Sequence, residues 1–363
     1  MAPDHPPHET PPVTQPALAP PRTDPTPIFE LFRGSYGTEL LTAAVAHFHL
    51  FGRLAAGPLR LESLRRILGL AERPAMVLVT ALRAMGLLVA DDQGWLGLSD
   101  LAREHLVPGG AFDVSGYIAL AADSPGVREM VERLRTNHPA GAQTRGRGVA
   151  FIYREGLDSA MEREDSARSL TLALAGRARN VAPALAGACP LPAARRLLDV
   201  GGGSGLYSIA YLQAHPGLEA VVWDRPEVLK VALELATAAG VADRLVCRPG
   251  DMFTDAVPEG ADVVLLSNVL HDWDVPECRA LVARLAAALP EGGRLLVHDV
   301  FLNDALDGPL PVALYSAALF TLTEGRAYSA AEYRAWLAEA GLHPGVVTPT
   351  LVHCGVLTGT KGP

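Results

Sequence analysis

Four glycines lie close together in the segment LLDVGGGSGLYS, residues 197–208. They stand at positions 201, 202, 203 and 205, between an apolar run that contains Asp199 and a helix-like segment. Glycine adopts positive φ at little cost and lets the backbone approach a ligand closely, so this turn is a candidate binding site. A dinucleotide site would have G-x-G-x-x-G, but the position of the last glycine holds Leu206. The charge of Asp199 would repel a pyrophosphate and attract a cationic amino group.

S-Adenosylmethionine fits these demands, because it carries a cationic amino-acid end, a ribose and an adenine but no phosphate. Asp224 ends the apolar run EAVVWD, a position from which an acid accepts hydrogen bonds from ribose hydroxyls. Asp251 would accept from the adenine amino group, and Met252 would pack on the ring. The predicted cofactor-binding residues are Asp199, Gly201, Gly203, Gly205, Asp224, Arg225, Asp251, Met252 and Ser267.

Apolar strands alternate with amphipathic helices from Arg195 onward, which predicts a doubly wound α/β sheet. The expected strands are RRLLDV, EAVVWD, RLVCRPGD, ADVVLLSN, GRLLVHDV, VVTPT and HCGVLTGT. Ligands bind such sheets at the carboxyl ends of the strands. The glycine turn follows the first of these strands, so the sheet would place it at the ligand-binding edge.

Sequence patterns divide the chain into four segments. Residues 1–26 are rich in Pro, Thr and His and are predicted to form a disordered tail. Residues 27–109 contain amphipathic helices followed by LLVADDQGWLGLS, a strand–turn–strand pattern that indicates a winged-helix-like unit. Residues 110–190 are predicted to be a helical linker and substrate-lid region, with its longest helix bent or restarted at Pro183. Residues 191–363 form the predicted donor-binding domain.

Composition and charge argue against several other functions. The 363-residue chain has a net charge of −9, which disfavours binding to nucleic acids. Residues 74–85, the candidate recognition helix, carry only one base, Arg83, so their apolar face is expected to pack on a partner chain. No apolar run approaches the roughly 20 residues needed to cross a bilayer, and the N-terminus lacks the pattern of a secretion signal. Four widely spaced cysteines without metal-ligand spacing fit a reducing cytoplasm.

Residues 28–360 resemble the small-molecule O-methyltransferases of plants and bacteria that have an N-terminal winged-helix dimerisation domain. The resemblance is carried by LLDVGGGSG, WDRPEV, GDMF, LSNVLHDWDVPEC, EGGRLLVHDV and AAVAHFHLFGRLAAGPLRLESL. It implies a class I methyltransferase fold, Rossmann-like, behind a mainly helical N-terminal domain that forms a homodimer. It also implies S-adenosylmethionine as the donor, which leaves as S-adenosylhomocysteine, and no metal.

The resemblance places a catalytic base at His271, in the HDW motif. A phenol has a pKa near 10, so a positioned histidine that takes its proton would accelerate transfer roughly 10²–10⁴-fold. In the plant members two acids flank this histidine. One matches Asp299, whereas the other falls on Ala327, although Glu324 lies nearby in the chain. The next segment, residues 274–277, reads D-x-x-E and predicts a helix start with a capping box.

An aromatic or polyketide-like small molecule with a hydroxyl group is the expected acceptor. The residues expected to line its pocket are Asn268, Leu319, Phe320, Tyr117 and Tyr153. The absence of the second acid leaves two alternatives open within the family: methylation of carbon, and a relative that binds the donor without methylating. An alternative of another class is a regulator that binds DNA through its winged helix, which the acidic charge disfavours.

Overall fold

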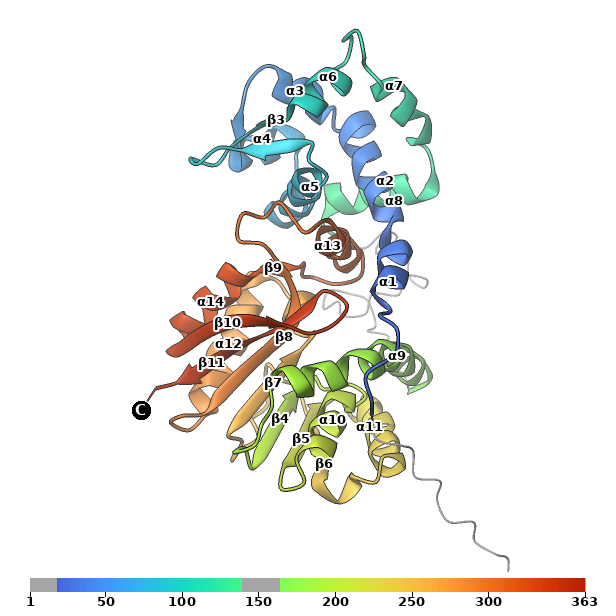
Figure 1. The fold of residues 1–363 in the computed structure, drawn as a ribbon. Coiled ribbons are helices and arrows are strands. Elements are labelled where there is room, and N and C mark those ends of the chain that lie inside the picture. The colour runs from blue at the N-terminus through green and yellow to red at the C-terminus, as the bar shows by residue number, and fades with distance from the viewer. Residues whose placement is uncertain (1–17, 139–163, 363) are drawn as a thin grey trace, which may run out of the picture.

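The computed structural model describes residues 18–138 and 164–362. A mainly helical N-terminal unit stands on an α/β unit, with α13 (Leu310–Leu322) between the two (Figure 1). α1 (Thr26–Arg33) runs along the side of the molecule and links them. Residues 1–17 of the predicted tail lie outside the described residues; Leu18 donates its backbone N–H to Gln213 at 2.8 Å. None of the described helices combines the length and the apolar character that crossing a bilayer requires.

Helices make up most of the N-terminal unit, and a small antiparallel sheet of order β1-β3-β2 lies at its edge. The turn between β2 and β3 is closed by Asp91, whose carboxylate accepts the backbone N–H groups of Gln93 and Trp95. The strand–turn–strand predicted for LLVADDQGWLGLS is therefore confirmed. The elements of this unit after α1 are α2 (Ser35–Thr42), η1 (Ala43–His47), α3 (Leu50–Ala55), β1 (Leu59–Arg60), α4 (Leu61–Leu68), α5 (Glu72–Ala84), β2 (Leu88–Ala90), β3 (Trp95–Leu98), α6 (Asp100–His105), α7 (Ser115–Ile118), η2 (Ala119–Ala121) and α8 (Pro125–Thr136).

A single long helix, α9 (Glu164–Ala188), leads into the α/β unit and packs on α10 (Leu206–Ala214) and α11 (Pro226–Ala238). The helix continues through Pro183, so it is not restarted there as the sequence suggested. A proline inside a helix costs about 3 kcal/mol because it removes one hydrogen bond and clashes with the preceding turn. The buried side chains of Val181, Ala182 and Leu185 flank the proline, and their packing offsets that cost.

Eight strands form the sheet of the α/β unit, in the order β10-β11-β8-β7-β4-β5-β6, with β9 paired to β8. The strands from β8 to β6 are parallel, and β11 and β10 add an antiparallel edge. Every predicted strand is present, so the doubly wound α/β fold is confirmed. The strands are β4 (Arg196–Val200), β5 (Glu219–Asp224), β6 (Leu245–Pro249), β7 (Val263–Ser267), β8 (Arg294–Leu302), β9 (Tyr328–Ser329), β10 (Leu342–Pro349) and β11 (Cys354–Lys361).

Helix starts in the α/β unit follow from local capping chemistry. Asp274 caps α12 (Val275–Ala288), but its side chain accepts from Val275 rather than from the third residue, so the predicted reciprocal box does not form. A complete capping box instead starts α14 (Ala330–Glu339), where Ser329 and Glu332 bond to each other's backbone N–H. Two short 3₁₀ helices, η4 (Ala242–Arg244) and η5 (Leu270–Asp272), complete the unit.

Two buried arginines of the N-terminal unit hold the last turn of α13. Arg133, on α8, donates to the carbonyl oxygens of Phe320 and Thr323, each at 2.7 Å. Arg73, on α5, donates to Thr323 at 2.9 Å and also to Gly325. The last carbonyls of a helix have no partner within it and carry partial negative charge, so guanidinium groups stabilise them. This contact fixes the N-terminal unit on the segment that leads to β9.

Candidate active site

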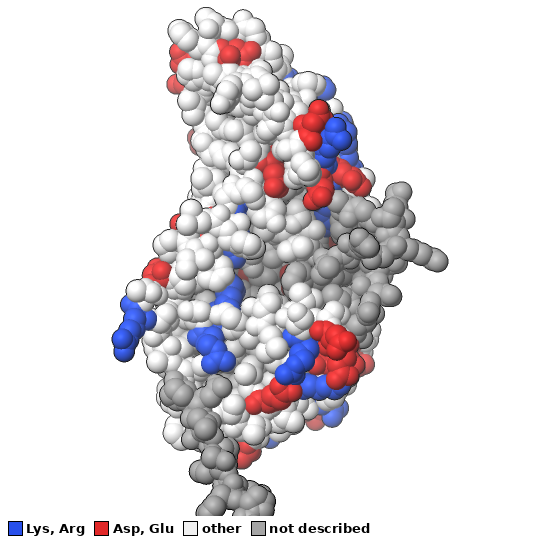
Figure 2. Space-filling view, turned by 90° about the vertical axis from the view of Figure 1, so that its right-hand side faces the viewer, with Lys and Arg blue, Asp and Glu red and all other residues white. Residues whose placement is uncertain are grey.

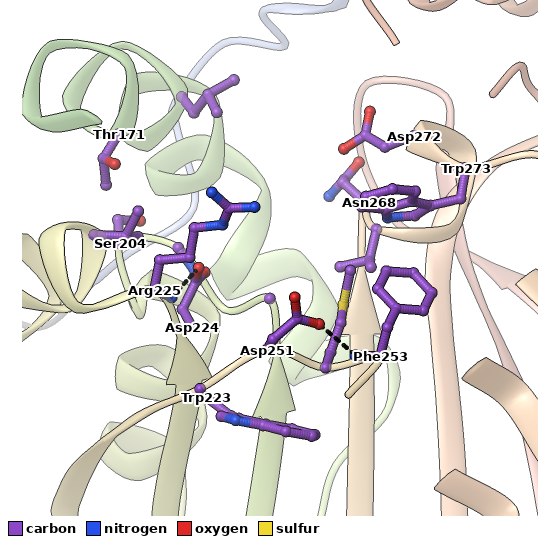
Figure 3. Close-up of a pocket in the computed structure, with 17 residues that line it drawn as sticks. Thr171, Ser204, Trp223, Asp224, Arg225, Asp251, Phe253, Asn268, Asp272 and Trp273 are labelled. Carbon is purple, nitrogen blue, oxygen red and sulfur yellow. Dashed lines mark hydrogen bonds between the residues drawn. The ribbon is translucent and has the colours of Figure 1, made fainter. Parts of the chain in front are cut away.

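A pocket opens at the carboxyl ends of β4, β5, β6 and β7, where the sequence places the glycine turn (Figure 3). In Figure 3, Asp224 and Arg225 lie on one side of it, Asn268, Asp272 and Trp273 on the other, and Asp251 between them. Six of the nine predicted cofactor residues line it, and so do residues that the sequence did not single out. The lining residues are Thr171, Leu174, Gly201, Gly203, Ser204, Trp223, Asp224, Arg225, Val228, Gly250, Asp251, Met252, Phe253, Asn268, Val269, Asp272 and Trp273.

The glycine turn makes one wall of this pocket and needs glycine for two different reasons. Gly201 and Gly203 have φ of 62° and 58°, a conformation that side chains with a Cβ rarely adopt. At Gly202 a Cβ would lie 2.7 Å from the Cγ of Asp199 and 2.8 Å from a methyl of Val222. The turn therefore folds tightly over β4 and presents bare backbone to the pocket.

Asp224 ends β5 and binds the glycine turn directly. One of its carboxylate oxygens accepts the backbone N–H of Gly203 at 2.8 Å, and the other accepts that of Arg225 at 2.7 Å. Burial raises the pKa of the Asp224 carboxyl, and these two N–H groups partly offset that effect. The carboxylate lies at the pocket wall, where it can accept further hydrogen bonds from hydroxyl groups of a ligand.

The charges of the described lining suit S-adenosylmethionine better than a nucleotide diphosphate. Three carboxylates, Asp224, Asp251 and Asp272, line the pocket with one guanidinium, Arg225. Carboxylates accept from ribose hydroxyls and from an amino group and attract a cation, whereas they repel phosphate. The residues present therefore fit the predicted donor. The described residues contain no cluster of three or more His, Cys, Asp and Glu side chains arranged to hold a metal ion.

Three predicted cofactor residues do not reach the pocket. Asp199 is fully buried under the turn, where it accepts from the Ser208 hydroxyl at 2.7 Å, and burial raises its pKa to about 7. Gly205 faces α11, because a Cβ there would meet Ala232 at 3.4 Å. The hydroxyl of Ser267 bonds to His298 at 2.8 Å on the inner side of the sheet. These three residues shape the turn and its surroundings.

His271 lies in η5, directly after β7, and is 3% exposed. Its Nδ1 lies 2.5 Å from Oδ1 of Asp299, and its ring packs edge-on against Tyr315, with centroids 5.7 Å apart. Burial alone would lower the pKa of His271, but the charges of Asp299 and Asp272 outweigh it and raise the pKa. The phenol of Tyr333 donates to the second oxygen of Asp299 at 3.1 Å, which fixes the carboxylate.

The structure places Asp272 as a second acid beside His271. Its Oδ1 lies 3.6 Å from Nε2 of His271, which is too long for a hydrogen bond but close enough for the charges to interact. Burial raises the pKa of Asp272 to about 6. Ala327, where the family's second acid falls, is buried, with its N–H donated to Ser316. Glu324 contacts this region through its backbone N–H, which donates to the carbonyl of Asp272 at 3.2 Å.

The predicted acceptor residues separate into distinct places. Asn268 lines the pocket and donates to the Tyr207 hydroxyl at 3.2 Å. Leu319 and Phe320 are buried in α13, where Phe320 stacks under the guanidinium groups of Arg73 and Arg133. Tyr117 is 80% exposed on α7, in the N-terminal unit. Tyr153 lies outside the described residues. The structure thus brings only Asn268, of the described four, to the pocket.

Sequence reasoning missed three residues that surround His271 and Asn268. Tyr315, in α13, packs on the imidazole, and Arg33 from α1 lies over the Tyr315 ring. Arg177, in α9, donates to the amide oxygen of Asn268 at 2.8 Å and to the sulfur of Cys354 at 2.9 Å. Arg177 could have been noticed in the sequence as a charged residue within an alanine-rich helix. The other two carry no local signal, because α1, α9 and α13 meet only in the fold.

The doubly wound sheet, the glycine turn and the acid that ends the second strand define a class I methyltransferase. The sequence profile of the O-methyltransferase domain family matches residues 145–343, more than half of the chain. The chain therefore belongs to this family of S-adenosylmethionine-dependent O-methyltransferases.

Two relatives indicate the range of the family. The 3-hydroxy-5-methyl-1-naphthoate 3-O-methyltransferase of Streptomyces sahachiroi is 35% identical, over 87% of this chain and 89% of that protein. The L-tyrosine C(3)-methyltransferase of Streptomyces lavendulae is 39% identical over a shorter stretch, 41% of each chain. Among solved structures, an O-methyltransferase family 2 protein from Planctomyces limnophilus in complex with apigenin is 51% identical. It covers 96% of this chain and 99% of its own, with a TM-score of 0.86.

Proposed function

We propose that this protein transfers a methyl group from S-adenosylmethionine to a hydroxyl group of an aromatic small molecule of secondary metabolism, with His271 as general base. The observation that carries the proposal is the arrangement of the imidazole. Asp299 lies 2.5 Å from Nδ1, so Nδ1 carries the proton of the neutral ring and Nε2 keeps its lone pair. A base in this tautomer can accept the proton of a hydroxyl group.

The donor supplies a methyl group on a positively charged sulfur, which makes the methyl carbon electrophilic. The chain contributes the rest. Asp224, Asp251 and the glycine turn bind the ribose, the adenine and the amino-acid end, and so orient the donor. Nε2 of His271 takes the hydroxyl proton as the oxygen attacks, and Asp299 stabilises the imidazolium that forms. Asp199 acts on the loop, through Ser208 and beneath Gly202.

Ala327 stands where the family has its second acid. In this chain we propose that Asp272 is the second acid next to His271. Its carboxylate faces Nε2 at 3.6 Å from the side of the donor pocket. A negative charge there favours the protonated imidazole and also attracts a cation bound in the pocket. In this proposal Asp272 supports both the base and the donor, and it takes the role of the acid that is absent at Ala327.

Relatives support an aromatic hydroxyl compound as the acceptor. The 35% identical relative is named for a hydroxynaphthoate, and the 51% identical structure holds apigenin, a phenol. Both molecules are flat and carry hydroxyl groups on aromatic rings. A flat acceptor of this kind would place its hydroxyl at His271, beside the aromatic ring of Tyr315.

Methylation of carbon is the competing reaction, since one relative is named as a tyrosine C-methyltransferase. The test is a reaction of the full chain with S-adenosylmethionine labelled with ¹³C in its methyl group, and with apigenin and 3-hydroxy-2-naphthoate as acceptors. We expect a product 15 mass units heavier than the acceptor, with a ¹³C resonance of a methoxy group. A resonance of an aryl methyl group, or no transfer to either compound, would contradict the proposal.

The proposal includes a homodimer that forms through the N-terminal unit. The outer face of α1 exposes three large apolar side chains, Ile28, Leu31 and Phe32, which are 70%, 82% and 80% exposed. Exposed apolar side chains that lie together in this way are typical of a surface that contacts another protein chain. The helices and the small sheet β1-β3-β2 support the winged-helix interpretation of this unit.

A DNA-binding regulator is disfavoured by the position of the candidate recognition helix. α5 packs against α13 of the α/β unit, and Arg83, the one base of residues 74–85, donates to the carbonyl oxygen of Ala305 there. The face of the molecule in Figure 2 shows its described Lys and Arg residues interspersed with Asp and Glu, with no continuous basic surface. The four cysteines are all free, which agrees with the proposed location in a reducing cytoplasm.

A further inference from the structure

Two arginines that lie far apart in the sequence meet at Tyr315, next to the proposed base. The guanidinium carbon of Arg33, at the end of α1, lies 3.6 Å from the centre of the Tyr315 ring. That of Arg177, in α9, lies 5.9 Å from the same point. Arg33 is 7% exposed, so its charge has lost most of its contact with water. Two like charges so placed are unfavourable unless an anion compensates them.

No carboxylate within the described ranges pairs with either guanidinium. Arg177 donates to the amide of Asn268 and to the sulfur of Cys354, which are neutral acceptors, and its Nε has no described partner. Arg33 contacts aromatic rings, those of Phe29 and Tyr315. Burial lowers the pKa of Arg33, and the charge of Arg177 adds to this effect. The positive charge of the two guanidinium groups is therefore not balanced by a paired carboxylate among the described residues.

The nearest acids are already engaged by other groups. Asp299 lies against His271 through one oxygen and accepts from Tyr333 through the other. Asp272 faces the imidazole from the pocket side. Among the described residues, neither carboxylate forms an ion pair with an arginine. Burial alone would lower the pKa of Arg177, but nearby groups that include Asp299 outweigh it and raise the pKa, so the guanidinium stays charged and can bind a further anion.

The position of the arginines relates this anion to the acceptor. Arg177 bonds to Asn268, which lines the donor pocket, and the Tyr315 ring contacts both His271 and Arg33. A ring bound beside Tyr315 can therefore present a hydroxyl to His271 and an acidic group to the guanidinium pair. We propose that the acceptor is an aromatic acid, and that Arg177 and Arg33 bind its carboxylate while His271 deprotonates its hydroxyl.

This inference rests on the function proposed above, because it assigns the chemical class of the acceptor of the same site. The planar guanidinium fork matches a carboxylate and binds it through two parallel hydrogen bonds. Binding of the carboxylate also sets the orientation of the acceptor ring, and so selects which hydroxyl reaches Nε2. Arg177 and Arg33 are then determinants of specificity, because a neutral phenol would not be oriented in this way.

The test compares two ligands that differ only in the carboxylate, 3-hydroxy-2-naphthoate and 2-naphthol. Their dissociation constants are measured by calorimetry with the full chain, in the presence of S-adenosylhomocysteine. We expect the acid to bind about tenfold more tightly or better, as a charge-assisted hydrogen bond of this kind provides. Arg177→Met and Arg33→Met should each remove most of this preference, measured as the ratio of the two dissociation constants, and Arg177→Lys should keep part of it.

Arg179→Met is the matched control, because Arg179 lies on the same helix with an exposed side chain. The proposal is overturned if the wild-type protein binds the two ligands equally or binds neither, or if both Arg→Met variants keep the full preference. The last result would mean that the arginines serve the fold through their contacts with Tyr315. S-Adenosylhomocysteine is titrated first. If it does not bind, the proposed function fails, and the carboxylate preference is still measured on the protein alone.

Discussion

If His271 is the base, as we propose, its ionisation sets the pH range in which the site deprotonates an acceptor. Burial lowers its pKa, but Asp299 and Asp272 together raise it above the ordinary value of 6.5. Only the neutral imidazole accepts a proton, so activity is lost as the pH falls through this raised pKa. We expect kcat/KM to rise with pH along a limb whose midpoint lies above 6.5.

Removal of the charge of Asp299 should move this limb in a known direction. In Asp299→Asn the imidazolium loses its closest anion, so the pKa of His271 falls and the limb shifts to lower pH. The amide also orients the imidazole less well, and we expect maximal turnover to decrease by about 10–10²-fold. The measurement is kcat/KM against pH, with Asp304→Asn as control, because Asp304 pairs with Arg334 on the surface. A limb that stays in place would show that Asp299 does not act on the histidine.

Asp224 should affect binding of the donor rather than turnover at saturation. Its carboxylate holds the N–H of Gly203 and faces the pocket, so Asp224→Ala removes a ribose acceptor and loosens the glycine turn. We expect S-adenosylhomocysteine to bind about tenfold more weakly or worse, as measured by calorimetry. This change corresponds to the loss of one to two hydrogen bonds to a charged group. Asp243→Ala, at an exposed position, should bind it as the wild type does. Equal affinities of the two variants would remove Asp224 from the site.

Individual residues could be predicted where their role depends on strand ends. Asp224, Asp251 and the glycines were found because parallel strands bring their carboxyl ends to one edge. Asp199 occupies the same edge in sequence, yet its side chain points under the turn, since alternate residues of a strand face opposite sides. A distinction of this kind needs the register of the strand relative to the loop, which the sequence pattern does not contain.

At the scale of elements, η5 is held in place by the segment that precedes β9. A Cβ at Gly325 would overlap the carbonyl oxygen of His271 and lie 2.6 Å from the backbone N of Trp273. Gly325→Ala should therefore displace the turn that carries the base. We expect a loss of stability of about 1–3 kcal/mol and a fall in turnover larger than that in donor affinity.

Gly187→Ala is the control for this substitution. Gly187 lies in α9, where a Cβ would meet nothing within 4 Å, so alanine should be neutral or stabilise the helix by up to about 1 kcal/mol. Both variants are compared by denaturant unfolding and by kcat. If Gly325→Ala matched the wild type in both, the contact with η5 would have no part in the positioning of His271.

Elements were predictable where a periodic pattern ran long enough, as in the strands of the sheet and the β2–β3 hairpin. The continuity of α9 through Pro183 was not predictable, because burial of its neighbours outweighs the local effect of proline. The capping box was expected at Asp274 and found at Ser329, since both segments match the same short pattern. Short patterns mark a helix start without fixing its hydrogen bonds.

At the scale of the molecule, α1 is expected to connect two chains. Glu30 anchors it to His353 of the α/β unit at 2.7 Å, and its opposite face exposes Leu31 and Phe32. Leu31→Glu combined with Phe32→Glu would place two charges in a buried interface. We expect the wild-type protein to sediment as a dimer and the double variant as a monomer. Val346→Glu is the control, since Val346 is 80% exposed on β10, in the other unit. A monomeric wild type would disprove the dimer.

The arrangement of the two units follows from contacts that no sequence pattern displays. Arg73 and Arg133 are both buried against the end of α13. Leu319 and Phe320 are buried in the same contact between the two units, and so they do not line the pocket as expected. Three distant segments, α1, α9 and α13, meet around Tyr315, where we propose that the acceptor binds.

The role of His271 as the base is the central claim, and one substitution tests it most directly. In His271→Ala the donor pocket keeps all its described lining residues, so affinity for S-adenosylhomocysteine should match that of the wild type. Turnover of a hydroxylated aromatic acceptor should fall by roughly 10²–10⁴-fold, the usual contribution of a general base. His343→Ala, at an exposed position on β10, should retain full turnover. If His271→Ala turned over within a few-fold of the wild type, the proton would be leaving by another route and the account would be wrong.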